Sequence, residues 1–189
     1  MSEPQNAPDM VPVRRRDRAE DGVWIEAFLA RVPTGILALA GNAGEAPYVN
    51  SNIFVYDASD RSLIFHTARL GALRDRVDAG EPAHATFHAF TMGRLLPDTR
   101  ALEFSVEYES VTATGTIDVV SAPDEAERAL QQIMDKYAPH LVPDRDYEPA
   151  TAADLKRTSV YRLRIGSWSG KRKQAPADAA GAYLYTPRY

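Results

Sequence analysis

The chain has 189 residues, of which 44% are hydrophobic and 25% are charged, the balance of one globular domain rather than of a disordered or fibrous protein. A formal net charge of −4 gives no attraction to nucleic-acid phosphates or to an anionic membrane surface, so we expect neither as a partner. Cysteine is absent, which excludes disulfides, thiolate metal sites, iron–sulfur clusters and cysteine nucleophiles, so redox chemistry would require a bound cofactor.

Both ends of the chain differ in composition from its middle. Residues 1–13 are rich in proline and polar residues, and residues 174–189 are rich in alanine and proline. We therefore expect a flexible N-terminal tail and a C-terminal tail around one folded domain, residues 14–173. The first twenty residues contain no apolar stretch for a signal peptide, and no apolar run approaches the roughly 20 residues that cross a bilayer. We expect a cytoplasmic location.

The predicted elements begin with a helix that Asp21 caps and that ends before Pro33, with its apolar residues on one face. Short extended runs separated by turn residues follow, and they predict an antiparallel meander. These runs span residues 34–40, 48–56 and 63–67, with turns at 41–44 and 57–62. A short helix at 70–77, closed by Gly80, then leads to a strand at 83–90 and a loop around Gly93 and Pro97.

The clearest strand signal spans residues 102–120, where apolar and polar residues alternate. The phase flips after Ser110, which predicts a bulge or a bend across two faces of a barrel. A helix at 124–137 follows, and Thr151 with Asp154 resembles a capping box for a short third helix before the last strand, residues 159–165. Six or seven short strands without repeated βα units predict a mainly β fold, a small antiparallel barrel with short peripheral helices.

The histidines give no clear metal site. His84 and His88 lie on one face of a predicted strand, roughly 13 Å apart by strand rise, which is too far to share one ion. We expect a structural or surface role for both. His66 ends a predicted strand just before a turn, and its residue type alone leaves open a structural role and a site role. Glycine-loop nucleotide motifs, the zincin motif and the serine-hydrolase elbow are all absent from the sequence.

Two clusters of residues could bind an anionic cofactor. Thr67 is followed closely by Arg69, Arg74 and Arg76, and these hydroxyl and guanidinium groups could hold a phosphate, although the last two arginines could equally form a solvated helix face. Residues 167–171, placed after the predicted last strand, include an aromatic ring and a cation, which suit a flat anionic cofactor. The alternative is a tryptophan that only closes the core.

Four segments, in this order, resemble the nitroimidazole-resistance (Nim) flavoproteins of the pyridoxamine 5′-phosphate oxidase-like superfamily. They are residues 63–67 with Gly71 and Arg74, then 103–115, then 154–161, then 168–171. The resemblance covers nearly the whole expected domain. It implies an FMN-binding split β-barrel that works as a homodimer, with FMN at the subunit interface and lined by residues of both chains.

The resemblance also implies the cofactor contacts. The strand at 47–54 would run beside the flavin ring, and the histidine matching His66 faces the flavin in these proteins, which favours a catalytic role. The positions that match the family would contact the ring edge (Asn50, Ser51 and Asn52), lie near the ribityl phosphate (Thr67, Gly71 and Arg74) or make further contacts (Ser110, Trp168 and Lys171).

The chain departs from true pyridoxamine phosphate oxidases in two places. Gly71-Ala72-Leu73 stands where those enzymes have Ser-Arg-Lys, and their C-terminal arginine–histidine substrate clamp is missing. We therefore expect an FMN-dependent reductase of small electrophiles, with nitroimidazoles as one candidate substrate class, and not vitamin B6 oxidation. Two alternatives stay open. One is a non-catalytic flavin-binding or haem-binding protein, in which His66, His84 or His88 could ligate iron, and the other is a plain dimeric structural module.

Overall fold

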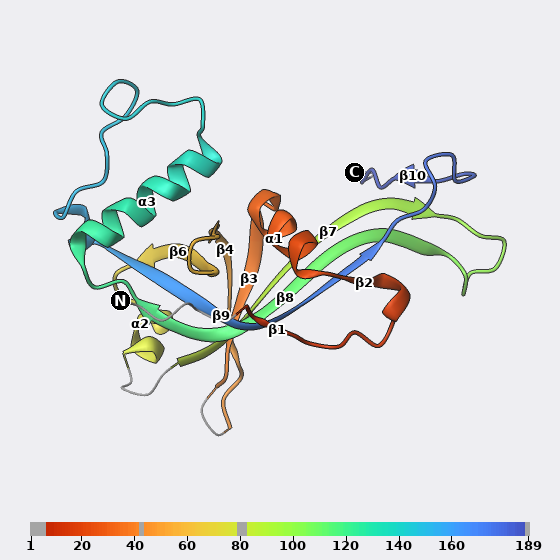
Figure 1. Cartoon of the computed structure of the whole chain (residues 1–189), viewed down its shortest axis with the longest axis horizontal. Helices are drawn as coiled ribbons and strands as arrows, with labels where there is room; N and C mark the ends of the chain where they lie inside the picture. The colour runs from red at the N-terminus through yellow and green to blue at the C-terminus, as the bar shows by residue number, and fades with distance from the viewer. Residues whose placement is uncertain (1–6, 42–43, 79–82, 188–189) are drawn as a thin grey trace.

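The structure is a computed structural model that describes residues 7–41, 44–78 and 83–187. In these ranges ten strands join one sheet, and the helices lie around it (Figure 1). The strands are β1 (Asp9–Met10), β2 (Ala19–Glu20), β3 (Thr34–Leu39), β4 (Tyr48–Ile53), β5 (Val55–Asp57), β6 (Ser62–Ala68), β7 (Ala83–Leu96), β8 (Ser105–Val119), β9 (Thr158–Lys173) and β10 (Tyr183–Leu184). The α-helices are α1 (Gly22–Arg31), α2 (Ala72–Val77) and α3 (Pro123–Tyr137), and single 3₁₀ turns form η1 (Arg16–Arg18) and η2 (Asp154–Lys156).

The main path of the sheet runs β4-β3-β7-β8-β9-β6-β5, with every neighbouring pair antiparallel. Only Phe54 separates β4 from β5 in sequence, although these strands end the path on opposite sides, so the sheet curls into a half-open barrel. The predicted split β-barrel with short peripheral helices is confirmed. The predicted meander is only partly correct, because β7, β8 and β9 lie between the hairpins β3–β4 and β5–β6.

Two hydrophobic clusters lie on opposite sides of β6 and β9. The larger cluster fills the barrel, where Phe54 packs edge-on against Phe87 with 4.6 Å between ring centroids. Helix α1 closes this barrel and begins as predicted, since Asp21 accepts a hydrogen bond from the Trp24 backbone nitrogen at 2.8 Å. The smaller cluster joins α3 to the outside of β6 and β9 through residues such as Ile64 and Val160. Successive residues of β6 and β9 therefore face different surroundings.

The bounds of the long strands β7 and β8 differ from the predicted ones. Strand β7 continues through Gly93, where we expected a loop, and its register with β8 shifts between Met92 and Leu95. Strand β8 begins only at Ser105, so Leu102 lies in a turn and is 85% exposed. These ends extend past the barrel (Figure 1), so the residues before Ser110 have no core to face.

This extension explains the phase flip in β8, because the register is regular through Ser110 and contains no bulge there. The irregularity lies further on, where β9 has one extra residue, Gly166, opposite Thr114 and Gly115. Strand β9 also continues to Lys173, so residues 167–171 lie inside this strand rather than after it.

The described parts of both expected tails contribute short strands. Strand β1 pairs with β9, and β10 pairs with β7 (Figure 1). Arg94 holds the C-terminal segment by donating to the carbonyls of Ala175, Pro176 and Ala177. The expected third helix is the single turn η2, and Gly80 and the turn residues 42–43 lie outside the described residues. Within the described ranges, no helix has both the length and the apolar character needed to cross a membrane.

Lys136 of α3 connects α1 to the bend between β4 and β5. Its ammonium group donates to the carbonyls of Val32 and Phe54 at 2.9 Å each, and it lies 4.2 Å from the Phe54 ring centroid. Burial lowers the pKa of Lys136 to about 8.

Stability should therefore depend on pH through Lys136. Between pH 8 and 10.5 the folded state has lost this proton while the unfolded chain keeps it, so the free energy of unfolding should rise with pH. The slope is at most about 1.4 kcal/mol per pH unit. Urea unfolding of the wild type and of Lys136→Met between pH 7 and 10 measures it. An equal pH dependence in the two proteins would contradict this role for Lys136.

Candidate functional site

The end of β6 presents two predicted site residues to opposite sides. His66 pairs with Val160 and Thr67 pairs with Ser159 across the antiparallel β6–β9 ladder. Because adjacent side chains of a strand alternate, His66 faces α3, whereas Thr67 lies on the barrel side, with its Oγ1 3.5 Å from the Tyr161 hydroxyl. The two residues therefore do not line one surface.

The chain turns after β6 and places Arg74 against β9. Gly71, just before α2, has φ +144°, which is in the region that favours glycine. Arg74 donates from Nη1 to the buried Ser159 hydroxyl at 3.3 Å, and its Nε donates to Asp78, the residue that follows α2. The Ser159 hydroxyl donates in turn to the Arg69 carbonyl at 3.4 Å. The guanidinium of Arg74 is thus fixed between a helix and a strand.

A cavity of about 260 Å³, here called the Arg74 cavity, opens beside this contact. Its polar lining consists of three cations and three hydroxyls, contributed by Arg69, Arg74, Lys156, Ser121, Thr158 and Ser159. No carboxylate is among the described residues that line it, and Pro123, the first residue of α3, borders it. Such a set of donors suits a phosphate group.

A larger cavity of about 800 Å³, here called the His66 cavity, lies between β6, α3 and residues 144–154. The Nδ1 atom of His66 is buried and has no hydrogen-bond partner among the described residues. Burial lowers the pKa of His66, so its imidazole is neutral at neutral pH. The two cavities are neighbours, because Leu155 lines the Arg74 cavity and Asp154 lines the His66 cavity.

The remaining predicted site residues fall in three places. Ser51, Ser110 and Lys171 share the outer sheet face, defined here as the side of strands β4, β3, β7, β8 and β9 that faces away from the barrel core. Asn50 and Asn52 lie on the opposite side of β4, where the Asn50 amide donates to the Asn52 side-chain oxygen at 3.2 Å. The structure therefore does not bring the three residues 50–52 to one surface.

Trp168 is 3% exposed and belongs to the barrel core, beside Gly22 at the start of α1. The sequence left two interpretations of Trp168 open, a cofactor contact and a residue that closes the core. Its position in the structure is that of a core residue. Its predicted partner Lys171 is exposed on the other side of β9.

Sequence reasoning missed Lys156, Thr158 and Ser159 as individual members of the Arg74 cavity. They lie in the segment 154–161, which is part of the resemblance to the Nim flavoproteins. The sequence therefore marked the segment as important but did not show that these residues line a cavity with Arg74. Thr158 and Ser159 lie opposite Ala68 and Thr67 because β6 pairs with β9, about ninety residues away in the chain, and Lys156 lies in η2 just before β9. Local sequence patterns do not give such long-range pairing.

The outer sheet face is partly apolar and exposed. Val49 is 60% exposed, Phe90 53%, Ile36 44% and Ile53 42%. His88 lies at the centre of this face and its Nδ1 is 2.9 Å from the Thr112 hydroxyl. Burial, and then the charge of Lys171, lowers the pKa of His88. Exposed apolar side chains gathered on one face of a sheet are typical of a surface that contacts another molecule.

Comparisons with known proteins agree with this architecture. No curated protein matches the chain. The flavocytochrome Anf3 from Azotobacter vinelandii superposes with a TM-score of 0.73 at 19% identity, covering 94% of this chain and 86% of the other. The FAD- and heme-binding protein from Mycobacterium smegmatis gives 0.68 at 23% identity, covering 89% and 84%. A protein from Bacteroides thetaiotaomicron VPI-5482 proposed to confer 5-nitroimidazole antibiotic resistance gives 0.62 at 20% identity, covering 81% and 84%.

The superpositions establish a shared fold. The sequence itself matches the family described as pyridoxamine 5′-phosphate oxidase over residues 24–172, a stretch that runs from α1 through nearly all of β9 and includes the Arg74 cavity. Since this match covers most of the chain, the protein belongs to the pyridoxamine 5′-phosphate oxidase family.

Proposed function

We infer that the protein binds FMN and acts as a flavin-dependent reductase of small electrophiles, with nitroimidazoles as one candidate class. The observation that carries this proposal is the Arg74 cavity, whose three cations and three hydroxyls match the needs of a phosphate group. Family membership and the resemblance to Nim flavoproteins support the proposal that this phosphate group belongs to a flavin nucleotide. FAD is the alternative nucleotide, because one of the similar structures is an FAD-binding protein.

The residues of this chain would have separate tasks. Arg69, Arg74 and Lys156 would bind the phosphate, and Ser159 holds Arg74 in place for it. A bound flavin would supply the electron-transfer chemistry. The Nδ1 of the neutral His66, which has no partner in the described part of the chain, would form a hydrogen bond with an electron-accepting substrate in the His66 cavity. It could also exchange a proton with that substrate.

The proposal includes a homodimer in which a second copy covers the outer sheet face. The exposed side chains of Ile36, Val49, Ile53 and Phe90 support it, since a contact would remove their apolar surface from water. Ser51, Ser110 and Lys171 lie on the same face, so a cofactor at the interface could contact them from the second chain.

The test is the absorption spectrum of the purified protein together with its thermal shift on adding FMN or FAD. At 100 times the dissociation constant, the nucleotide adds about 2.7 kcal/mol, or roughly 5–10 °C for a chain of this size. Arg74→Ala should weaken FMN binding roughly 10- to 100-fold, because charge-assisted hydrogen bonds are lost. Arg128→Ala, an exposed arginine on α3, is the matched control and should bind normally. A colourless protein indifferent to both nucleotides would refute the proposal.

A non-catalytic flavin- or haem-binding protein is the second candidate. The observation that favours haem is His66, a neutral imidazole whose buried Nδ1 has no partner within the described ranges, and neutral imidazole is the form that binds iron. Two of the similar structures are described as a flavocytochrome and as a heme-binding protein. A Soret band that is lost in His66→Ala, with flavin absorption kept, would favour this candidate. Flavin absorption alone, with slower nitro reduction in His66→Ala, would favour the reductase.

A further inference from the structure

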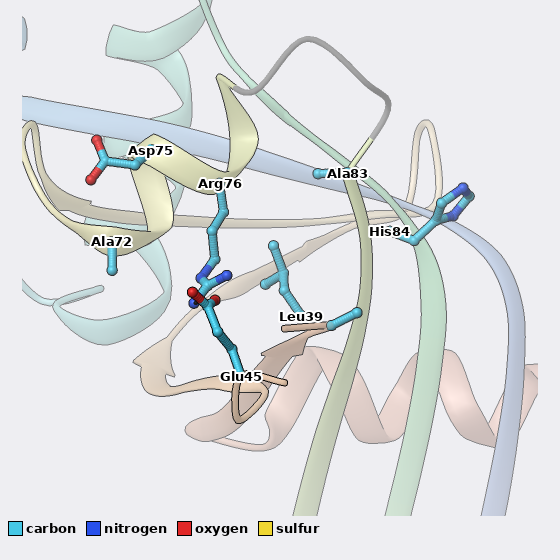
Figure 2. Close-up of a pocket in the computed structure, with 8 residues that line it drawn as sticks. Leu39, Glu45, Ala72, Asp75, Arg76, Ala83 and His84 are labelled. Atoms are coloured by element: carbon cyan, nitrogen blue, oxygen red, sulfur yellow. Dashed lines mark ion pairs between the residues drawn. The ribbon is translucent and has the colours of Figure 1, made fainter. Parts of the chain in front are cut away.

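Helix α2 carries two arginines that serve different cavities. Arg74 borders the Arg74 cavity, whereas Arg76 projects into a separate cavity of about 530 Å³ between α2, the end of β3 and the start of β7. Figure 2 shows the Arg76 guanidinium pointing into this space toward Glu45. Leu39, Ala72 and Ala83 contribute apolar surface to its walls. We call it the Arg76 cavity.

Arg76 is poorly satisfied within the described part of the chain. Its Nε is buried and has no hydrogen-bond partner among the residues that the structure describes. Its Nη2 lies 3.6 Å from the Glu45 carboxylate, which is too long for a good hydrogen bond, and its guanidinium lies 5.9 Å from the Tyr48 ring centroid. The Glu45 side chain is 53% exposed, so this ion pair contributes little and is readily exchanged. The donors of Arg76 are therefore available to another carboxylate.

We propose that the Arg76 cavity binds a small organic monocarboxylate. The planar guanidinium can donate two parallel hydrogen bonds to the carboxylate, while the apolar body of the ligand packs against Leu39 and Ala83. A monoanion suits the site better than a phosphate dianion, because Arg76 is the single arginine or lysine among the described lining residues and Glu45 is close to it. Asp75 and His84 point away from Arg76 in Figure 2, so neither side chain blocks the guanidinium.

Benzoate is the probe, and benzamide is its neutral control of the same shape. Titration calorimetry and thermal shift, with the protein saturated with FMN and without FMN, should show benzoate binding in both states and much weaker binding of benzamide. Arg76→Gln should weaken benzoate binding at least tenfold. Arg76→Lys should weaken it less, because a lysine keeps the positive charge but cannot donate two parallel hydrogen bonds to the carboxylate. Glu45→Gln should strengthen it roughly two- to fivefold, since it removes the competing carboxylate. Arg74→Gln should leave it unchanged.

The outcomes separate this proposal from the proposed flavin site. Benzoate binding that is lost in Arg74→Gln and kept in Arg76→Gln, or that competes with FMN, would place the anion in the Arg74 cavity and overturn the inference. FMN binding lost in Arg76→Gln but normal in Arg74→Gln would overturn both assignments. Absence of benzoate binding to a wild type that binds FMN would overturn only the inference about the Arg76 cavity.

Discussion

Replacing Gly115 by alanine should destabilise the protein by about 3 kcal/mol or more, a fall in melting temperature of roughly 6–12 °C. Gly115 lies in β8 opposite the extra residue of β9, where the two backbones approach closely. A Cβ atom at this position would lie 1.8 Å from the Arg164 carbonyl oxygen and 2.8 Å from its carbon. Both atoms belong to the backbone of a central strand, so they cannot rotate away as a side chain would.

Gly166→Ala is the matched control, because Gly166 is the extra residue of the same irregularity. The nearest atom to a Cβ there is the Thr114 carbonyl oxygen at 3.8 Å, an ordinary contact. Thermal and urea unfolding of both variants should show a large loss for Gly115→Ala and a small change for Gly166→Ala. Similar losses in the two variants, or a stable Gly115→Ala protein, would contradict the close approach of β8 to β9.

Local signals in the sequence predicted most of the secondary structure. Asp21 caps α1 as its position before an apolar face suggests, and α3 occupies almost the predicted range. The alternation after Ser110 also predicted the buried residues Val111, Ala113 and Ile117 correctly. These features depend on neighbours within a few residues, where capping and periodicity act directly.

The order of the strands could not be predicted in the same way. The meander places β3 and β6 in one local group, whereas the structure inserts three later strands between them. The gain from this arrangement comes from residues far apart in the chain, such as Phe65 of β6 stacking on Tyr161 of β9 at 5.6 Å between centroids. Local sequence patterns do not identify contacts between residues that are this far apart in the chain.

The candidate site shows the same division. The predicted anion-binding cluster comprised Thr67, Arg69, Arg74 and Arg76. Arg69 and Arg74 line the Arg74 cavity, whereas Arg76 lines a different cavity and Thr67 faces the barrel. Alternation within a strand could have shown that His66 and Thr67 face opposite sides. Which side has a cavity depends on the position of α3, so the separation of the His66 cavity from the Arg74 cavity required the structure.

The apolar run of β3 is the sequence feature that points to the outer sheet face. Leu37 and Leu39 are buried in the barrel, whereas Ile36, the residue before Leu37, faces the other side of the strand and is 44% exposed. A strand that is apolar on both faces is typical of one that is covered on both sides. Within the described chain only one side of β3 has such cover, which is why we propose that a second copy supplies the other.

Ile36→Asp should therefore convert the proposed dimer into monomers. Ile36 pairs with Ser51 on one side and with His88 on the other, near the middle of the outer sheet face. In a symmetric dimer the substitution buries two unpaired carboxylates, one from each copy, and should raise the dissociation constant at least about a hundredfold. Sedimentation velocity at several protein concentrations measures it.

Val23→Asp is the control for Ile36→Asp, because Val23 is 78% exposed on α1 and lies away from the outer sheet face. It introduces the same charge and should leave the oligomeric state unchanged. If FMN is lined by residues of both chains, the Ile36→Asp monomer should also lose FMN binding, while the Arg74 cavity itself stays intact. A wild type that is monomeric at micromolar concentration, or an Ile36→Asp protein that still forms dimers, would show that this face is not the interface. Monomers that bind FMN with wild-type affinity would instead place the whole flavin site within one chain.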